Sequence, residues 1–130
     1  MSRAYTVTAT ALALGVSPKW LDNVLSHNKL AGVRQKRQGI ARRLSREALL
    51  VLALAIRLTE DMGLPTAHAI RLAEKLVHGR GEFSPSQGIV VKADLTLVEN
   101  LLTDRLATAV EIAPAPLRGR PRLNKTGRLE

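Results

Sequence analysis

The spacing of apolar and polar residues near the N-terminus predicts two short helices. Residues 8–14 form a largely apolar run with Thr8 as its N-cap and Gly15 just past its C-terminus. Ser17 and Pro18 predict the start of a second helix, because serine caps helices and proline is favoured at the first helical position. Two short helices joined by a glycine turn predict a helix-turn-helix.

The second helix is expected to run to about Ser26, with Leu21, Val24 and Leu25 on its inner face. A helix-turn-helix also needs a small residue where the two helices cross, and Ala11 meets this need. The same spacing fits a helical hairpin that binds no ligand, so both interpretations stay open.

A strongly basic segment follows the second helix. Residues 33–37 and 40–44 are two short runs joined by Gln38 and Gly39, a turn signal for a β-hairpin, and we call residues 33–44 the basic hairpin. Its apolar and polar residues alternate irregularly, so we expect an exposed two-stranded ribbon outside the core. A run of like charge is either a solvated surface or a contact for a polyanion. Its cations are Arg34, Lys36, Arg37, Arg42 and Arg43.

Two longer helices are expected next. Ser45 predicts the N-cap of a helix over about 46–62 that ends at Gly63. Its face is almost wholly apolar, which is typical of the central helix of a core. Residues 64–66 open a further helix that ends at Gly79.

The C-terminal third predicts a small separate unit. A strand is expected over 89–93, followed by a helix that Asp94 caps, and residues 108–112 are expected to form a second strand that pairs with the first. A unit of this size is marginally stable by itself. It should therefore pack on the N-terminal region or on a second copy of the chain.

The last residues have a different composition. Residues 114–130 are rich in proline, glycine and arginine and predict a disordered tail. Arg118 to Pro121 match the core of an AT-hook, whose arginines lie along a narrow minor groove, with Arg120 as the second of them and Arg122 following. The alternative is a basic tail that only raises solubility.

These elements divide the chain into three parts. We expect a DNA-binding domain over 1–79, a small C-terminal unit over 80–113 with a possible role in dimerisation, and the basic tail over 114–130. The fold class is mainly α with a small β-hairpin.

Charge is also unevenly distributed along the chain. The net charge is +9, and arginine supplies 14 of the 20 cations, which suits bidentate contacts with phosphate or guanine. Residues 1–46 hold nine cations and one acid, residues 47–112 hold six and nine, and residues 113–130 hold five and one. A basic beginning and a basic end favour two separate contacts with a polyanion.

The chemistry of an enzyme is not visible in the sequence. There is no cysteine, so disulfides, thiolate nucleophiles and sulfur-ligated metals are excluded. His27 stands apart from the other histidines, and the ten-residue separation of His68 and His78 is interpreted as placing them on different sides of a helix. Glu60 and Asp61 are adjacent and point apart on a helix. We expect no catalytic residue, no metal and no cofactor.

The apolar runs and the N-terminus also indicate where in the cell the protein is expected. The most apolar run, residues 48–56, is too short to span a bilayer, and no secretory signal is visible at the N-terminus. The expectation is a cytoplasmic, nucleoid-associated protein with no membrane partner.

Three short segments of the sequence, taken together, match a known pattern. They are Gly15-Val16-Ser17 with Leu21, QGIARRLS over 38–45, and EDMGLPTAHAI over 60–70. The set resembles the DNA-binding domain of the MerR family of winged-helix regulators over about residues 5–78. The resemblance implies a winged helix-turn-helix of four helices with a small β wing, followed here by a small C-terminal α/β or helical unit.

The sequence also departs from that family. Asp22, Asn23 and Val24 stand where the family has an arginine and two aromatic residues that contact DNA. The long coiled coil through which the family dimerises is absent. The family's DNA contacts are therefore not transferred to these positions.

Duplex DNA is the polyanion that the composition favours. Aromatic residues make up 2% of the chain, too few for the stacking platforms of proteins that bind single strands or RNA. We predict that the second helix enters the major groove, with Ser17 and Lys19 exposed and with Lys19 and Asn23 contacting base edges. Trp20 is expected either to pack on a sugar or a thymine methyl group, or to be buried between this helix and the basic hairpin. The arginines and lysine of the basic hairpin are expected to contact phosphates.

The sequence therefore predicts a non-enzymatic transcriptional regulator that binds double-stranded DNA sequence-specifically. We expect a repressor that acts as a homodimer or a cooperative oligomer on DNA. One alternative is an architectural or excisionase-like DNA-binding factor. Another is a protein-interaction adaptor whose basic charge is incidental.

Overall fold

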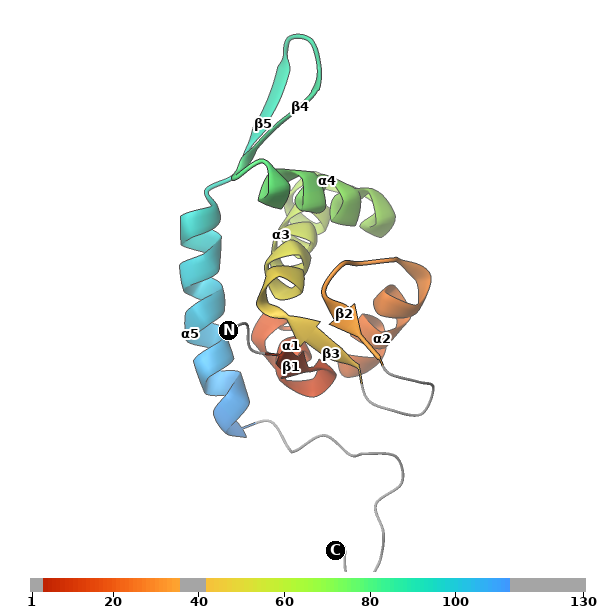
Figure 1. The fold of residues 1–130 in the computed structure, drawn as a ribbon, viewed down its shortest axis with the longest axis vertical. Helices are drawn as coiled ribbons and strands as arrows, with labels where there is room; N and C mark the ends of the chain where they lie inside the picture. Colours follow the sequence, from red (N-terminus) through yellow and green to blue (C-terminus); the bar gives the residue numbers. More distant parts are fainter. Residues whose placement is uncertain (1–3, 36–41, 113–130) are drawn as a thin grey trace, which may run out of the picture.

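A computed structural model describes residues 4–35 and 42–112 of the chain. In these two ranges the chain is mainly helical, with two small antiparallel sheets (Figure 1). This agrees with the predicted class of a mainly α protein with a small β component. The elements in chain order are β1 (Ala4–Thr6), α1 (Val7–Leu14), α2 (Pro18–His27), β2 (Val33–Arg34), β3 (Arg43–Ser45), α3 (Arg46–Met62), α4 (Thr66–His78), β4 (Glu82–Ser86), β5 (Ile89–Lys92) and α5 (Leu95–Ile112).

The first helix begins earlier than the sequence predicts. Thr6 is the N-cap, and its Oγ1 accepts a hydrogen bond of 3.0 Å from the backbone N–H of Ala9. The prediction of Thr8 as N-cap was wrong, because β1 ends in an extended Thr6 that already caps the helix. The predicted C-terminal glycine is confirmed, since Gly15 has a φ of 72° and the left-handed conformation that ends a helix.

The second helix has its predicted start and its predicted inner face. The Oγ of Ser17 accepts a hydrogen bond of 3.0 Å from the backbone N–H of Trp20, and proline occupies the first turn. Leu21 and Val24 are buried, and the helix ends at His27, one residue beyond the predicted end. The N-cap serine and the proline after it therefore predicted the start of this helix correctly.

The described ends of the basic hairpin, in β2 and β3, lie in a three-stranded sheet, and this corrects the expectation of an exposed two-stranded ribbon. Strand β3 is central, with β1 on one side and β2 on the other. Tyr5 and Val33 both pair with Leu44, which is 0% exposed. The apolar residues of the three strands form one row against the core. The predicted turn at Gln38 and Gly39 lies outside the described residues.

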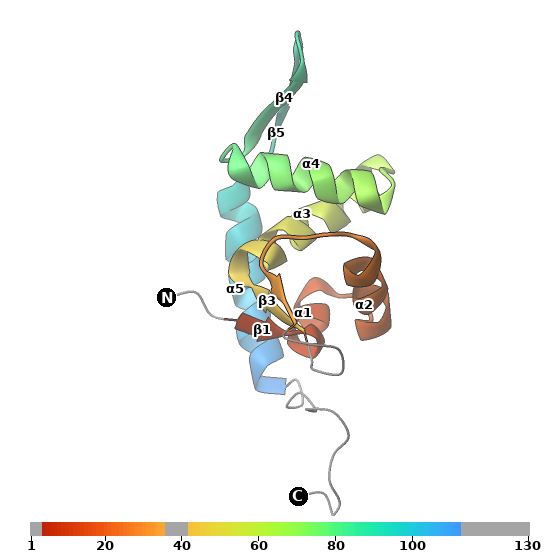
Figure 2. The same ribbon diagram turned by 45° about the vertical axis from the view of Figure 1, so that its right-hand side comes forward.

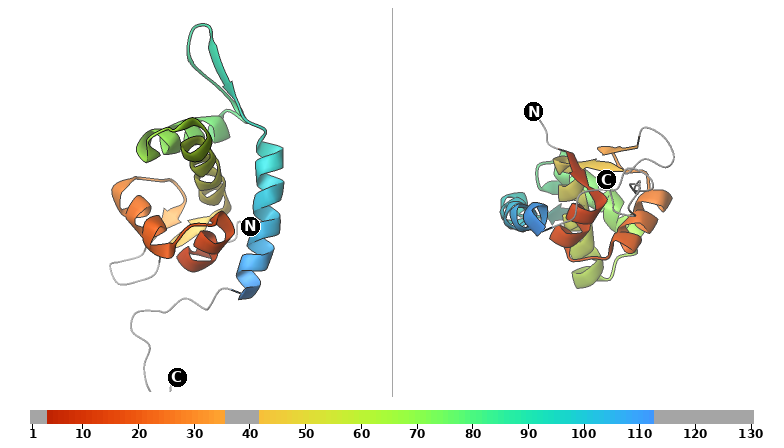
Figure 3. Two further views of the ribbon diagram at one scale, coloured as in Figure 1. Left: turned by 180° about the vertical axis from the view of Figure 1, so that it is seen from behind. Right: turned by 90° about the horizontal axis from the view of Figure 1, so that it is seen from below.

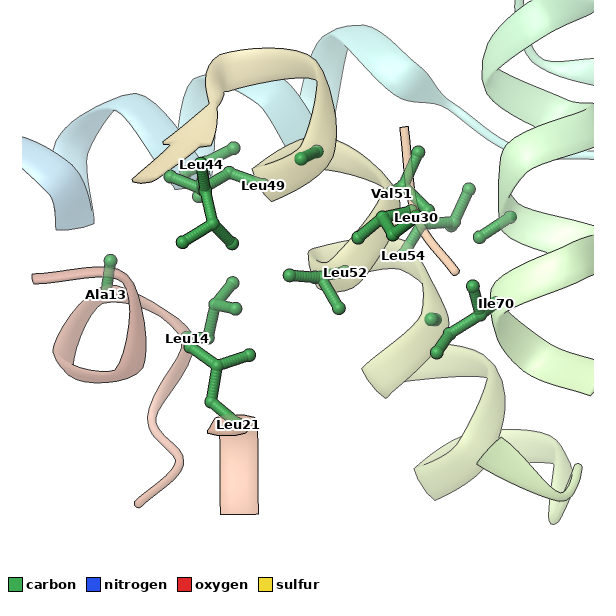
Figure 4. Packing of buried hydrophobic residues seen from close by; sticks show 14 of the residues in the cluster. Ala13, Leu14, Leu21, Leu30, Leu44, Leu49, Val51, Leu52, Leu54 and Ile70 are labelled. Carbon is green, nitrogen blue, oxygen red and sulfur yellow. The ribbon is translucent and has the colours of Figure 1, made fainter. Parts of the chain in front are cut away.

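Helix α3 is the central helix of the core, as its apolar face predicts. It contacts α4, α5, α1 and β3, and its N-cap Ser45 accepts a hydrogen bond of 3.2 Å from the backbone N–H of Ala48. Its ends agree with the predicted 46–62. Figure 4 shows Leu44 lying among the apolar side chains of this core, between Leu14 and Leu49.

The C-terminal third differs from its prediction in one element. Residues 108–112 are the last part of α5, so the predicted second strand was wrong, and β5 pairs with β4. The buried residues Leu102, Leu106 and Ala109 continue the helical spacing, which keeps this end helical. The predicted cap is confirmed, since the Oδ1 of Asp94 accepts a hydrogen bond of 3.0 Å from the backbone N–H of Leu97.

Helix α5 packs on the N-terminal region. It lies along α1 and also contacts α3, and its buried residues belong to the same core as theirs. Figure 3 shows α5 and α2 on opposite sides of the molecule. The outer surface of α2 is therefore not covered by α5.

The β4–β5 hairpin extends away from the helices (Figure 2). It leaves α4 through a tight junction in which Gly81 has a φ of 97° and its carbonyl accepts a hydrogen bond of 2.8 Å from the N–H of Ala93. A Cβ on Gly81 would lie 2.6 Å from the oxygen of Ala93, so the close approach requires glycine. The amino group of Lys75 lies 4.9 Å from the centre of the Phe83 ring and holds the base of the hairpin against α4.

Candidate nucleic-acid interface

Helix α2 presents a polar face to solvent, on the side opposite its buried leucine and valine. Side chains three and four residues apart share one face of a helix. Lys19, Asp22, Asn23 and Ser26 have this spacing, and all four are exposed. We call these four residues the polar face of α2.

Arg42 connects this face with the basic hairpin. Arg42 directly precedes β3, and its Nη1 lies 3.2 Å from the Oδ1 of Asp22, while its Nη2 donates a hydrogen bond of 3.1 Å to the Oγ of Ser26. Its Nη1 also donates to the backbone oxygen of Asp22 at 3.4 Å. The start of β3 and the polar face of α2 therefore lie side by side on one surface.

Two further arginines of the basic hairpin lie directly opposite each other. In the pairing of β2 with β3, Arg34 stands opposite Arg43. Side chains alternate along a strand, so these arginines lie on the sheet face opposite Leu44. Among the described residues, no ion pair of either arginine with an acid is present. Like charges facing each other across a strand pair repel, and an anion bound between them would relieve this repulsion.

The cations of the basic hairpin thus fall into two groups. Arg42 is bound to α2, and only 23% of its side chain is exposed. Arg34 is exposed and Arg43 is half-buried, and both are positioned by the strand pairing. Lys36 and Arg37 lie outside the described residues, as do Arg118, Arg120 and Arg122 of the tail.

The remaining predicted residues of α2 differ in their surroundings. Ser17 is exposed, and its side chain caps the helix. Trp20 is half-buried and lines a hollow together with Ile56 and Glu60 of α3. Its predicted burial between α2 and the basic hairpin was therefore wrong, because the indole lies on the α3 side of the helix.

The sequence interpretation missed Asp22 and Ser26 as members of this site. In the sequence, Asp22 is a departure from the MerR pattern and Ser26 is the expected end of the helix. Their spacing of four residues on the helix was the available signal, since one guanidinium can then contact both. Which arginine makes that contact depends on the fold.

The histidines also lie differently from their predicted places. His68 and His78 are both exposed on α4. Ten residues at about 100° each leave them about 80° apart, so the placement on different sides of the helix was wrong. Arg71 and Lys75 are exposed on the same side between them. Among the described residues, no group of three histidine or acidic side chains could hold a metal ion.

No helix in the described part of the chain has both the length and the apolar character that a membrane span requires. Comparison with protein-family models, curated proteins and solved structures finds no match to this chain. The case for the interface therefore rests on the residues and contacts described above.

Proposed function

We propose that this protein is a sequence-specific regulator that binds double-stranded DNA and has no catalytic activity. In this proposal the polar face of α2 enters the major groove. The basic hairpin acts as the wing of a MerR-like winged helix-turn-helix and contacts the neighbouring backbone. The observation that carries the proposal is the bond network of Arg42, which places the two elements on one surface.

The dimensions and chemistry of α2 support a place in the major groove. The groove is about 12 Å wide and admits one helix. Lys19 and Asn23 are exposed near the start of α2, and asparagine and lysine side chains form specific contacts with adenine and guanine edges respectively. Trp20 is directed toward α3, so we assign it to packing and not to DNA.

The arrangement of Arg34 and Arg43 supports the contact with the backbone. Two arginines whose backbones are held opposite each other by strand pairing form a local concentration of positive charge. Phosphate oxygens accept bidentate hydrogen bonds from guanidinium groups. We propose that these two arginines neutralise phosphates beside the groove that α2 occupies.

We further propose a homodimer or a cooperative oligomer on DNA, repression of a promoter, and a location on the nucleoid. Helix α5 lies on the opposite side of the molecule from α2, and its Leu97 and Leu101 are exposed apolar residues that would suit contact with a second copy. The AT-hook-like arginines of the tail would add a contact with the minor groove of A·T-rich DNA.

Selection from randomised duplexes tests this function. We expect a defined motif, whose symmetry reports how many copies bind. Asn23→Ala should relax the motif, whereas Arg34→Ala and Arg43→Ala should weaken binding to all sequences about equally. Lys92→Ala is the matched control, because it removes one exposed cation from the distant β4–β5 hairpin and should leave DNA binding unchanged.

The dependence on salt gives a second readout. A complex with about six neutralised phosphates should lose roughly 10³-fold in affinity between about 50 and 200 mM salt. Each of the two arginine variants should reduce the slope of log K against log salt by about 0.9. The proposal fails if the protein has no affinity for any duplex at low salt, or if Lys92→Ala weakens binding as much as Arg43→Ala does.

A further inference from the structure

Asp22 is an unusual residue for the surface on which it lies. Residues 1–46 contain nine cations and this one acid. It occupies the middle of the polar face of α2, between Lys19 and Ser26. An acid that faces a phosphate backbone without compensation would oppose binding, so its charge there needs an explanation.

Arg42 compensates this charge and also restricts the side chain. One guanidinium contacts the carboxylate of Asp22 at 3.2 Å and the hydroxyl of Ser26 at 3.1 Å. Ser26 in turn donates a hydrogen bond of 2.8 Å to the backbone oxygen of Asp22. The carboxylate is therefore held by a partner that α2 does not itself supply.

The carboxylate nevertheless stays open to solvent. Its side chain is 55% exposed, although Arg42 is bound to it. An ionised carboxylate has about four positions for hydrogen-bond donors, and the contact with Arg42 uses only part of that capacity. A base edge placed against α2 would thus contact the oriented carboxylate of Asp22, which can accept hydrogen bonds but cannot donate them.

We infer that Asp22 is a specificity-determining residue that selects cytosine in the major groove, and that Arg42 is the positioning residue that neutralises and orients it. Cytosine presents its N4 amino donor there, and acidic side chains accept from it. Guanine presents only the N7 and O6 acceptors, which a carboxylate repels. This inference rests on the proposed function.

The inference also gives Arg42 a different role from its hairpin neighbours. Its donors are directed to three acceptors on α2, whereas Arg34 and Arg43 face each other on the outer surface of the sheet. We therefore expect Arg34 and Arg43 to contact phosphates, and Arg42 to contact protein.

The first experiment compares the selected motifs of the intact chain and two variants. Asp22→Asn keeps the shape and an acceptor for Arg42 but adds an amide donor, and amides pair with adenine N6 and N7. We expect the preferred base at one position to change from cytosine to adenine. Asp22→Ala should lower the preference for cytosine at that position about tenfold and leave the other positions intact.

The second experiment measures the salt slope of two arginine variants. Arg43→Ala should reduce the slope by about 0.9, because a phosphate contact is lost. Arg42→Ala should weaken binding to every duplex but leave the slope unchanged. Circular dichroism checks folding, and Arg42→Gln, which removes the charge but keeps an amide donor for Asp22 and Ser26, replaces Arg42→Ala if that variant is unfolded.

The outcomes separate this inference from the proposed function. If the intact chain selects a motif and folded Asp22→Asn and Asp22→Ala select the same motif, the inference is overturned and the proposed function stands. If Arg42→Ala or Arg42→Gln loses salt slope as Arg43→Ala does, the positioning role is overturned. If the intact chain binds no duplex, both fail.

Discussion

Replacement of Leu44 by alanine tests whether the basic hairpin is built into the core. Leu44 is 0% exposed on the central strand, with Tyr5 and Val33 paired on either side, and β3 contacts α1 and α3. The substitution removes about three methylene equivalents at roughly 0.8 kcal/mol each. A cavity term adds to this, and buried leucine-to-alanine changes cost about 2.7–5 kcal/mol.

We expect a loss of about 3 kcal/mol in the free energy of unfolding, because the neighbouring strands β1 and β2 keep the structure from collapsing into the cavity. For a domain of this size the melting temperature should fall by roughly 12 °C. Chemical denaturation followed by circular dichroism measures the free energy, and the m-value should stay constant. Leu12→Ala is the matched control, because this leucine is 46% exposed.

The control should change the free energy by less than about 0.5 kcal/mol. An exposed ribbon, which the sequence alone predicts, would give the same small value for Leu44→Ala. A loss under about 1 kcal/mol at Leu44 would therefore refute its place in the core and the central position of β3.

Three further changes probe α1 and its turn, each measured as a change in the free energy of unfolding. Thr10→Val should stabilise the protein by about 1 kcal/mol, because the buried Oγ1 of Thr10 has no hydrogen-bond partner among the described residues. The control Thr8→Val, at a half-buried position, should have little effect on stability. A loss of stability in Thr10→Val would reveal a partner for the hydroxyl. Gly15→Ala should lower the free energy of unfolding by about 1 kcal/mol, because alanine is strained at the φ of 72° that Gly15 adopts. No atom lies within 4 Å of the added Cβ, so backbone strain is the sole cause of this loss. An unchanged stability would contradict the left-handed conformation. Ser17→Ala should cost about 1 kcal/mol by loss of the N-cap, while Ser17→Asp should retain stability and would not do so if the cap were absent.

Most helices of this fold follow from local signals. The helix starts at Ser17, Ser45 and Asp94 depend on a side chain that caps the next turn, and each was predicted from a few neighbouring residues. The helix ends at Gly15 and Gly63 depend on a left-handed residue in the same way. Such interactions span three to six residues, so the residues that determine each helix end are all close together in the sequence.

The errors occurred where distant segments meet. Strand β1 was not predicted, because three residues carry little pattern and gain their structure only by pairing with β3. Residues 108–112 were assigned to a strand because their apolar content is compatible with either structure. They are helical because α5 packs on α1 and α3, which buries one face of the helix through Ala109.

The candidate site shows the same division. Capping signals, helix-turn-helix spacing, the basic run and the resemblance to the MerR family identified α2 and the basic hairpin as the polyanion-binding candidates, because all of these are features of short segments. The sequence could not distinguish one arginine of the hairpin from another. Arg42 bonds to Asp22 and Ser26, while Arg34 and Arg43 face each other, because strand register and helix orientation decide which side chains meet across about 20 residues of chain.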